Sequence, residues 1–287
     1  MSQGIDSDAV PAVTVIRPPR GWQLINFAEL WHFRDLLYFL AWRDVKVRYK
    51  QTLLGVAWAV LQPALMMSIF YIIFTVVTHT YQGERPYPLF VFSALLPWTF
   101  FATAIANAGN SVIGSERLIT KIYFPRLAVP FATVAASIVD FCVALPLLLI
   151  LFVCYGEVPG WNILMLPIIF ALFVVCAAGV GTLLAALNVA YRDFRYIIPF
   201  MVQLWMYATP TIYIELAPSN PASKYPWVQD LLPLNPLTGL IASFRAALLN
   251  EPIPWPMLGF SALMAVLFFL VGCFYFRRME DSFADVI

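Results

Sequence analysis

The stretch RDVKVRYKQTLLGVAWAVLQP, from Arg43 to Pro63, passes from strongly basic to apolar and decides the fold. Four of its first eight residues are cations, namely Arg43, Lys46, Arg48 and Lys50. Arg43, Lys46 and Lys50 recur at i, i+3 and i+7, which places them on one face of a helix. The residues that follow are apolar or aromatic for about the width of a bilayer. The stretch therefore predicts a basic collar at the cytoplasmic foot of a membrane-spanning helix.

Composition excludes an ordinary soluble domain. Of 287 residues, 62% are hydrophobic and only 11% are charged, whereas about a quarter of the residues of a soluble domain are charged. Six apolar stretches are long enough to cross about 30 Å of hydrocarbon. They are Leu53–Val77, Pro88–Ala108, Leu127–Val153, Trp161–Val189, Tyr196–Ile214 and Met257–Phe276. The predicted fold is an all-α integral membrane protein with six transmembrane helices.

Lysine and arginine are segregated by loop, which predicts the topology. Of the 17 cations, 14 fall on the side of the two termini and 3 on the other side. The larger group is Arg17, Arg20, Arg34, Arg43, Lys46, Arg48, Lys50, Arg117, Lys121, Arg126, Arg192, Arg195, Arg277 and Arg278, and the smaller is Arg85, Lys224 and Arg245. We therefore expect a multi-pass protein with both termini in the cytoplasm.

The region before the first span divides into two parts. Residues 1–23 lack the apolar core of a signal peptide and predict a flexible cytoplasmic tail. Residues 24–52 hold FAELWHFRDLLYFLAW (Phe27–Trp42) and the collar, and this mixed polar and apolar segment predicts an amphipathic helix at the headgroup boundary. Its role is either a lipid anchor or a surface for a cytoplasmic partner. The transmembrane domain then covers residues 53–276, and residues 277–287 form a second cytoplasmic tail.

Two connecting segments are unusual. Between the second and third spans, Ser115 or Gly114 is a candidate cap for a short amphipathic helix that Pro125 ends; the alternative is a simple solvated turn. The segment from Glu215 to Pro256 contains eight prolines. It predicts short re-entrant helices on the outer side, including one over 237–249 that is too short to span.

Asp140 is the one acid predicted deep inside a span, where a carboxylate costs about 2.5 to 3.5 kcal/mol. It is a candidate proton or cation site, but a single acid without a basic or second acidic companion is a poor relay. Ser137, one turn away, is the expected hydrogen-bond partner. We therefore predict a structural, interhelical role for Asp140.

The chain offers little for catalysis. The histidines His32 and His79 lie far apart in the predicted topology, and no nucleophile elbow or zinc-binding motif is present. No glycine is followed by lysine, so the phosphate-binding loop of an ATPase is absent. The four cysteines lack CxxC spacing and predict packing rather than a metal site. We expect a chain that is not an enzyme and binds no cofactor or metal.

Aromatic side chains fall into two groups. Those at span ends, such as Tyr87, Trp98, Trp161 and Trp255, predict an interfacial belt. Those within the first and fifth spans either pack in the interior or line a pathway suited to stacking on sugar rings. The candidate lining residues are Trp58, Phe70, Tyr71, Trp205, Tyr207 and Tyr213.

Four segments together resemble the ABC-2 type permeases that export bacterial polysaccharides, such as O-antigen, capsule and teichoic acid exporters. They are Arg43–Pro63, ALLPWTFF (Ala94–Phe101), LITKIYFPRLAVP (Leu118–Pro130) and NPLTGLIASFRAALL (Asn235–Leu249), preceded by the amphipathic segment. The resemblance runs from about Trp22 to Arg278.

The resemblance implies a homodimer in the bacterial inner membrane with two separate ATPase subunits that carry the ATP and Mg²⁺. Ser115–Phe124 corresponds to a coupling helix seated in the ATPase, with Ser115, Glu116, Arg117, Leu118, Lys121 and Tyr123 as its site residues. Pro218–Pro254 corresponds to the re-entrant helices. The implied substrate is a glycan on undecaprenyl diphosphate, whose anionic group would favour Arg43, Lys46, Arg48 and Lys50. The alternative is that these cations only set orientation.

Other functional classes remain as alternatives. A membrane-embedded transferase needs acids or histidines clustered at one interface, and an ion-coupled transporter or channel needs more than Asp140 inside the membrane. Within the resembled family, the alternative substrate is a small molecule or drug. Nothing in the composition points to a nucleic-acid partner, whereas membrane lipids are an expected one.

Overall fold

The computed structural model describes residues 27–50, 55–79, 81, 85–209, 232–280 and 283, and within these ranges every regular element is a helix. The N-terminal helices are α1 (Phe27–His32), α2 (Arg34–Tyr49) and α3 (Ala57–Tyr71), with α3 continued by the π-helical segment η1 (Ile72–Val77). Next come α4 (Tyr87–Gly114), α5 (Glu116–Ile119), α6 (Ala128–Tyr155), the 3₁₀ segment η2 (Trp161–Met165), α7 (Leu166–Ala190) and α8 (Phe194–Tyr207). The last are η5 (Leu232–Leu234), α10 (Pro236–Leu248) and α11 (Trp255–Glu280). The predicted all-α fold is confirmed.

Five helical segments are long and apolar enough to cross a bilayer among the described residues. They are Ala57–Val77, Tyr87–Gly114, Ala128–Tyr155, Trp161–Ala190 and Trp255–Glu280, with mean hydropathies between 1.9 and 2.8. Each coincides with a predicted span. The chain is therefore a multi-pass membrane protein.

The predicted span Tyr196–Ile214 corresponds in part to α8, which has 14 residues. Residues 210–231 lie outside the described part of the chain, so the count of six spans stays a prediction. The short apolar helix predicted over 237–249 is present as α10, with 13 residues. Asn235 caps α10 by accepting a hydrogen bond from the Leu237 N–H at 3.1 Å, and Pro236 occupies its first turn. That α10 is re-entrant stays a prediction, and residues 210–231 of the predicted re-entrant segment and the tail 1–23 fall outside the described residues.

Helix α4 forms the centre of the bundle, and 78% of its most apolar window is buried. It packs against α3, α6, α7, α8 and α10. Small residues allow the close approach to α7: a Cβ added to Gly181 would lie 2.7 Å from the Ala108 Cβ. The Asn188 side chain adds a polar contact, donating to the Gly109 carbonyl at 2.8 Å. Helix α4 is thus held by both packing and hydrogen bonding.

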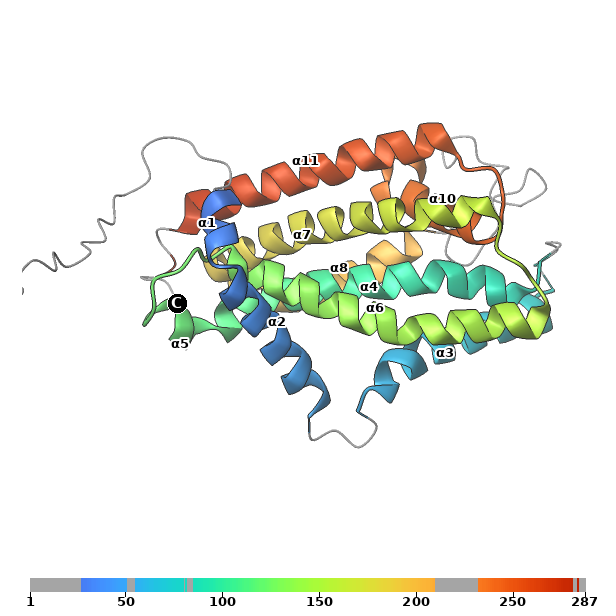
Figure 1. The fold of residues 1–287 in the computed structure, drawn as a ribbon, viewed down its shortest axis with the longest axis horizontal. Helices are drawn as coiled ribbons and strands as arrows, with labels where there is room; N and C mark the ends of the chain where they lie inside the picture. The colour runs from blue at the N-terminus through green and yellow to red at the C-terminus, as the bar shows by residue number, and fades with distance from the viewer. Residues whose placement is uncertain are drawn as a thin grey trace, which may run out of the picture.

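Helix α11 lies beside α7, and the two helices meet at a pair of glycines (Figure 1). A Cβ on Gly272 would stand 2.1 Å from the Gly179 carbonyl oxygen, and one on Gly179 would stand 2.4 Å from the Phe269 amide nitrogen. Real Cβ atoms do not approach that closely, so both positions require glycine at this helix separation.

The two ends of the bundle differ in chemistry. Helices α1, α2 and α5 and the last turn of α11 gather at one end, which we call the basic end (Figure 1). Arg126, two residues before α6, donates to the Glu280 backbone carbonyl at the end of α11 and so links the α5–α6 connection to α11. At the opposite end Arg85 pairs with Glu157 and donates to the Leu249 carbonyl at 3.2 Å.

Candidate functional site

Helix α2 carries the predicted basic collar and lies across α6. Where an amphipathic interface helix was predicted, the structure has two helices separated at Phe33, α1 and α2, and α2 runs on through the collar to Tyr49. The position of these helices at the membrane interface stays a prediction. Its apolar Leu40 is buried, whereas Tyr38 and Phe39 are exposed. Exposed aromatic side chains on a helix outside the bundle suit a headgroup-level position.

The four collar cations do not form one open patch. The Arg43 guanidinium lies 2.8 Å from the Asp44 carboxylate, and Arg48 is paired with Asp140. Lys46 stands over the Trp42 ring, 5.6 Å from its centroid, and Lys50 is exposed at the end of α2. Only part of the collar therefore presents its charge outward.

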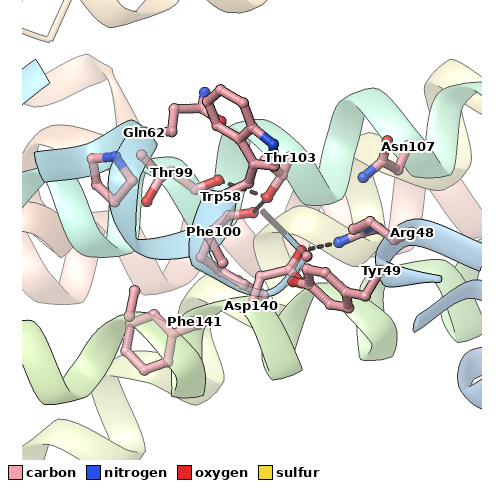
Figure 2. Close-up of a pocket in the computed structure, with 14 residues that line it drawn as sticks. Arg48, Tyr49, Trp58, Gln62, Thr99, Phe100, Thr103, Asn107, Asp140 and Phe141 are labelled. Carbon is pink, nitrogen blue, oxygen red and sulfur yellow. Dashed lines mark hydrogen bonds and ion pairs between the residues drawn. The ribbon is translucent and has the colours of Figure 1, made fainter. Parts of the chain in front are cut away.

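Asp140, near the middle of α6, is the meeting point of α2 and α6. The Arg48 guanidinium and the Tyr49 hydroxyl each donate to a different oxygen of the Asp140 carboxylate (Figure 2). The expectation that Asp140 lacks a basic companion is wrong, because the companion comes from α2 and not from a neighbouring span. The expected partner Ser137 instead donates to the Thr133 carbonyl at 3.2 Å.

Burial explains the chemistry of this triad. Desolvation lowers the pKa of Arg48 below its ordinary value, and the negative charge of the neighbouring Asp44 carboxylate opposes that shift. Burial likewise raises the pKa of Tyr49, so the phenol keeps its proton at neutral pH and donates it in the hydrogen bond. An arginine stays charged in proteins, and a half-buried guanidinium therefore needs its carboxylate.

A second set of hydrogen bonds joins α2 to the start of α5. The Thr133 hydroxyl of α6 donates to Asp44 at 3.1 Å, and Asp44 also accepts from Arg43. Arg43 in turn reaches the Ser115 hydroxyl at 3.5 Å. Ser115 directly precedes α5, so a polar chain runs from α5 through α2 to α6.

Helix α5 is shorter than expected. The predicted helix was to end at Pro125, but α5 stops at Ile119 after one turn, and Ser115 makes no side-chain cap. Glu116, Arg117, Lys121 and Tyr123 are exposed, Leu118 is half-buried and Ser115 is buried. Ile119 and Phe124 pack in an apolar cluster with Leu40 of α2. The segment therefore has a charged surface that is exposed and an apolar surface that packs against the bundle, although most of the segment is turn rather than helix.

A cavity of about 380 Å³ opens where α2, α3, α4 and α6 meet. Figure 2 shows polar side chains from these helices around it, with the Arg48–Asp140 pair at one side. Its lining consists of Arg48, Tyr49, Gly55, Trp58, Ala59, Gln62, Pro63, Thr99, Phe100, Thr103, Asn107, Asp140, Phe141 and Ala144.

Three neutral polar residues of α4 were absent from the predicted site. Thr99, Thr103 and Asn107 recur at i, i+4 and i+8, so they form one stripe along a membrane-spanning helix. That spacing was a readable signal, because polar residues within spans face the bundle interior or a cavity. Gln62 on α3 completes the polar lining from the other side.

The predicted aromatic lining divides in the structure. Trp58 lines the cavity and is half exposed, whereas Phe70 packs against the core. Trp205 is partly buried: its ring meets Phe101 edge-on at 5.2 Å, and its indole N–H donates to the Asn235 side-chain oxygen at 3.0 Å. Tyr71 and Tyr207 are exposed, and Tyr213 lies outside the described residues. Of the members of this set that the structure describes, only Trp58 lines the polar cavity.

No group of three or more candidate metal ligands occurs among the described residues. The cavity holds one cation and one carboxylate that are already paired with each other, and its other polar groups are amides and hydroxyls. Such an arrangement can hold a ligand by hydrogen bonds and ring contacts, and its described lining residues provide no activated nucleophile.

Comparison with known proteins gives a consistent match over most of the chain. A family model described as "ABC-2 type transporter" matches residues 35–249. The "O-antigen export system permease protein RfbA" of Myxococcus xanthus is 31% identical over 261 residues, which cover 90% of this chain and 98% of that protein. The protein of the same name from Klebsiella pneumoniae is 28% identical over 264 residues, covering 90% and 97%. "Polysialic acid transport protein KpsM" of Escherichia coli is 21% identical over 248 residues, covering 84% and 92%.

Proposed function

Because this chain belongs to the ABC-2 type transporter family, we propose that it is the membrane subunit of an ATP-driven exporter of a bacterial polysaccharide. The observation that carries the proposal is the full-length match to permeases named for O-antigen export, which extends over 90% of this chain and 98% of the relative. Relatives named for O-antigen and polysialic acid transport both handle glycan polymers by name. They favour a polysaccharide over the alternative of a small molecule or drug.

The proposed topology places the basic end in the cytoplasm of a bacterial inner membrane. It is supported by the cations exposed there, including Arg117, Lys121, Arg192 and Arg195, because positive loops stay on the cytoplasmic side. The end formed by Arg85, Glu157 and α10 then faces outward. Six spans and two cytoplasmic termini follow from the same proposal.

The chain is proposed to work with two separate ATPase subunits, which supply the ATP and Mg²⁺, and with a second copy of itself. The family resemblance supports both partners. The segment around α5 suits an ATPase contact because Glu116, Arg117 and Lys121 are exposed while Ile119 anchors the turn. Lys121 and the neighbouring Tyr123 extend the same outer surface.

The polar chain described above suggests how force would reach the transmembrane helices. Displacement of α5 by an ATPase acts on Ser115, which contacts Arg43 of α2. Helix α2 is joined to α6 at Asp44–Thr133 and at Arg48–Asp140. An ATPase that binds one arrangement of these helices more tightly than another shifts the population between them, and hydrolysis resets it.

The proposed substrate is a glycan linked to undecaprenyl diphosphate. Its diphosphate would lie near the collar, where Lys46 and Lys50 remain available at the outer surface of α2. The paired Arg48 is less suited to that role than the sequence suggested, because Asp140 already neutralises it. Arg43 is intermediate, since it pairs with Asp44 but stays 39% exposed.

Deletion of the gene for this chain tests the proposal. Surface polysaccharide should be lost while lipid-linked glycan accumulates inside the cell, and expression of the chain should restore both. Co-purification with an ATPase encoded nearby tests the partner. Unchanged surface polysaccharide, together with altered tolerance of a small toxic compound, would contradict the proposal and favour the drug exporter.

A further inference from the structure

The cavity between α2, α3, α4 and α6 has a chemistry that packing alone does not require. The amides of Gln62 and Asn107 both line it, and neither side chain makes a hydrogen bond within the part of the chain that the structure describes. Both belong to membrane-spanning helices, and Gln62 is exposed while Asn107 is only partly buried, so their amide groups are accessible from the cavity. Their donors and acceptors are therefore available to a hydrogen-bonding occupant of the cavity.

The hydroxyls beside these amides are positioned as acceptors. Thr99 donates to the Leu96 carbonyl at 2.9 Å, and Thr103 donates to the Thr99 carbonyl at 2.7 Å. Each hydroxyl proton is therefore used within α4, and the oxygen lone pairs remain for the cavity. The lining thus offers amide donors and hydroxyl acceptors within about one helical turn of each other.

Charge distinguishes among possible occupants. The cation that lines the cavity, Arg48, is paired with Asp140, so the two carry no net charge together. A diphosphate would need an unpaired cation here and would be repelled by the carboxylate. A neutral ligand rich in hydroxyl groups meets neither obstacle, and a carboxylate with a guanidinium beside it offers such a ligand further acceptors and donors.

Size and shape point the same way. A cavity of about 380 Å³ is at the small end of the range of ligand pockets. Trp58 lines it with half of its surface exposed, and Phe100 and Phe141 add apolar surface. One aromatic surface surrounded by amides and hydroxyls matches a pyranose ring, which has an apolar C–H face and a rim of hydroxyl groups.

We propose that this cavity binds a single pyranose unit of the exported glycan. The C–H face of the sugar stacks on Trp58, and Gln62 and Asn107 hydrogen-bond its hydroxyl groups. The inference rests on the proposed function, since it names the part of the polymer that this chain holds. It also gives the polar stripe of α4 a role, which is to hydrogen-bond the sugar. An exporter that binds one sugar unit weakly can release it at each step of transport.

Saturation-transfer NMR on the full chain in lipid nanodiscs tests the site without any maltoside detergent. The probes are methyl α-D-glucopyranoside, methyl α-D-mannopyranoside, methyl β-D-galactopyranoside and methyl N-acetyl-β-D-glucosaminide, with sodium pyrophosphate as the anionic competitor and empty nanodiscs as the blank. We expect at least one glycoside to give transfer above the blank, and pyrophosphate not to displace it.

Substitutions locate the binding. Trp58→Leu should raise the dissociation constant about threefold to tenfold, the factor expected for one lost aromatic contact. Asn107→Leu and Gln62→Leu should each raise the dissociation constant by a similar factor, because each removes hydrogen bonds to the sugar. The matched control is Trp31→Leu, because Trp31 is 70% exposed on α1, outside the cavity, and its loss should leave binding unchanged. Size-exclusion profiles identify any variant that fails to fold, and the remaining variants then decide.

Three outcomes would overturn the site. They are no transfer from any glycoside, equal binding by Trp58→Leu and Trp31→Leu, and displacement by pyrophosphate, which would make the cavity an anion site. The export assay separates this inference from the proposed function. Trp58-dependent glycoside binding in a chain that fails to restore surface polysaccharide contradicts the function, whereas restored export without such binding contradicts the site.

Discussion

The ion pair between Arg48 and Asp140 should contribute more to the stability of the fold than an exposed ion pair does. The two side chains are 26% and 15% exposed. Exposed pairs contribute about 0 to 1 kcal/mol, and loss of one partner of a fully buried pair costs about 3 to 5 kcal/mol. For this mostly but not fully buried pair we therefore expect Asp140→Asn and Arg48→Gln each to lower the free energy of unfolding by about 2 kcal/mol.

A double-mutant cycle separates the pair from the individual side chains. Unfolding by titration with sodium dodecyl sulfate in mixed micelles, followed by far-ultraviolet circular dichroism, gives the free energy of each variant. The double variant should lose less than the sum of the singles, with a coupling of about 1 to 2 kcal/mol. Tyr49→Phe should show a smaller loss, since it removes one hydrogen bond and no charge.

Arg34 and Asp35 supply the matched control. Their charged atoms lie 3.8 Å apart, and the side chains are 61% and 94% exposed. The same cycle, with Arg34→Gln and Asp35→Asn, should give a coupling below about 0.5 kcal/mol. Equal couplings for the two pairs, or full stability of Asp140→Asn, would refute the reasoning. Export by Asp140→Asn should follow the amount of assembled protein, and loss of export at normal assembly would indicate a transport role instead.

Three further perturbations follow from other parts of the molecule. Replacing Glu116, Arg117 and Lys121 together with alanine should reduce ATPase co-purification and export at least tenfold while membrane insertion stays normal, and retention of both would remove α5 as the docking segment. Gly272→Ala should lower the free energy of unfolding by about 1 to 3 kcal/mol because its Cβ would meet the partner helix; Gly259→Ala, where nothing lies within 4 Å, is the control and should be neutral. Trp205→Phe should cost about 1 kcal/mol by removing the hydrogen bond to Asn235 while export persists, and lost export at unchanged stability would return Trp205 to the pathway.

Much of the architecture was predictable because it depends on local chemistry. The lengths of the apolar stretches follow from bilayer thickness, and five of the six predicted spans coincide with helices of sufficient length. The break before Tyr87 and the start of α10 at Pro236 follow from proline, which removes a backbone donor and sets φ at a helix start. Family membership was equally predictable, because the resemblance rests on short sequence motifs that occur in a fixed order along the chain.

The candidate site was less predictable, because it depends on how helices rotate and cross. Trp58, Arg48 and Asp140 were singled out for separate reasons, as an aromatic, a collar cation and a lone acid, yet the structure brings them to one cavity. Thr99, Thr103 and Asn107 were overlooked, because neutral polar residues in an apolar span give a weaker signal than charges or rings.

Sequence alone determined that this protein crosses a membrane, which end of it is basic and which family it belongs to. Hydropathy, charge and motif order are properties of consecutive residues, so no contact between distant segments is needed to read them. Only the tertiary structure decided that Arg48 neutralises Asp140 from 92 positions away, and that four helices enclose a polar cavity there. Those contacts are set by side-chain packing between helices, which the glycines of α7 and α11 allow and which a linear pattern does not specify.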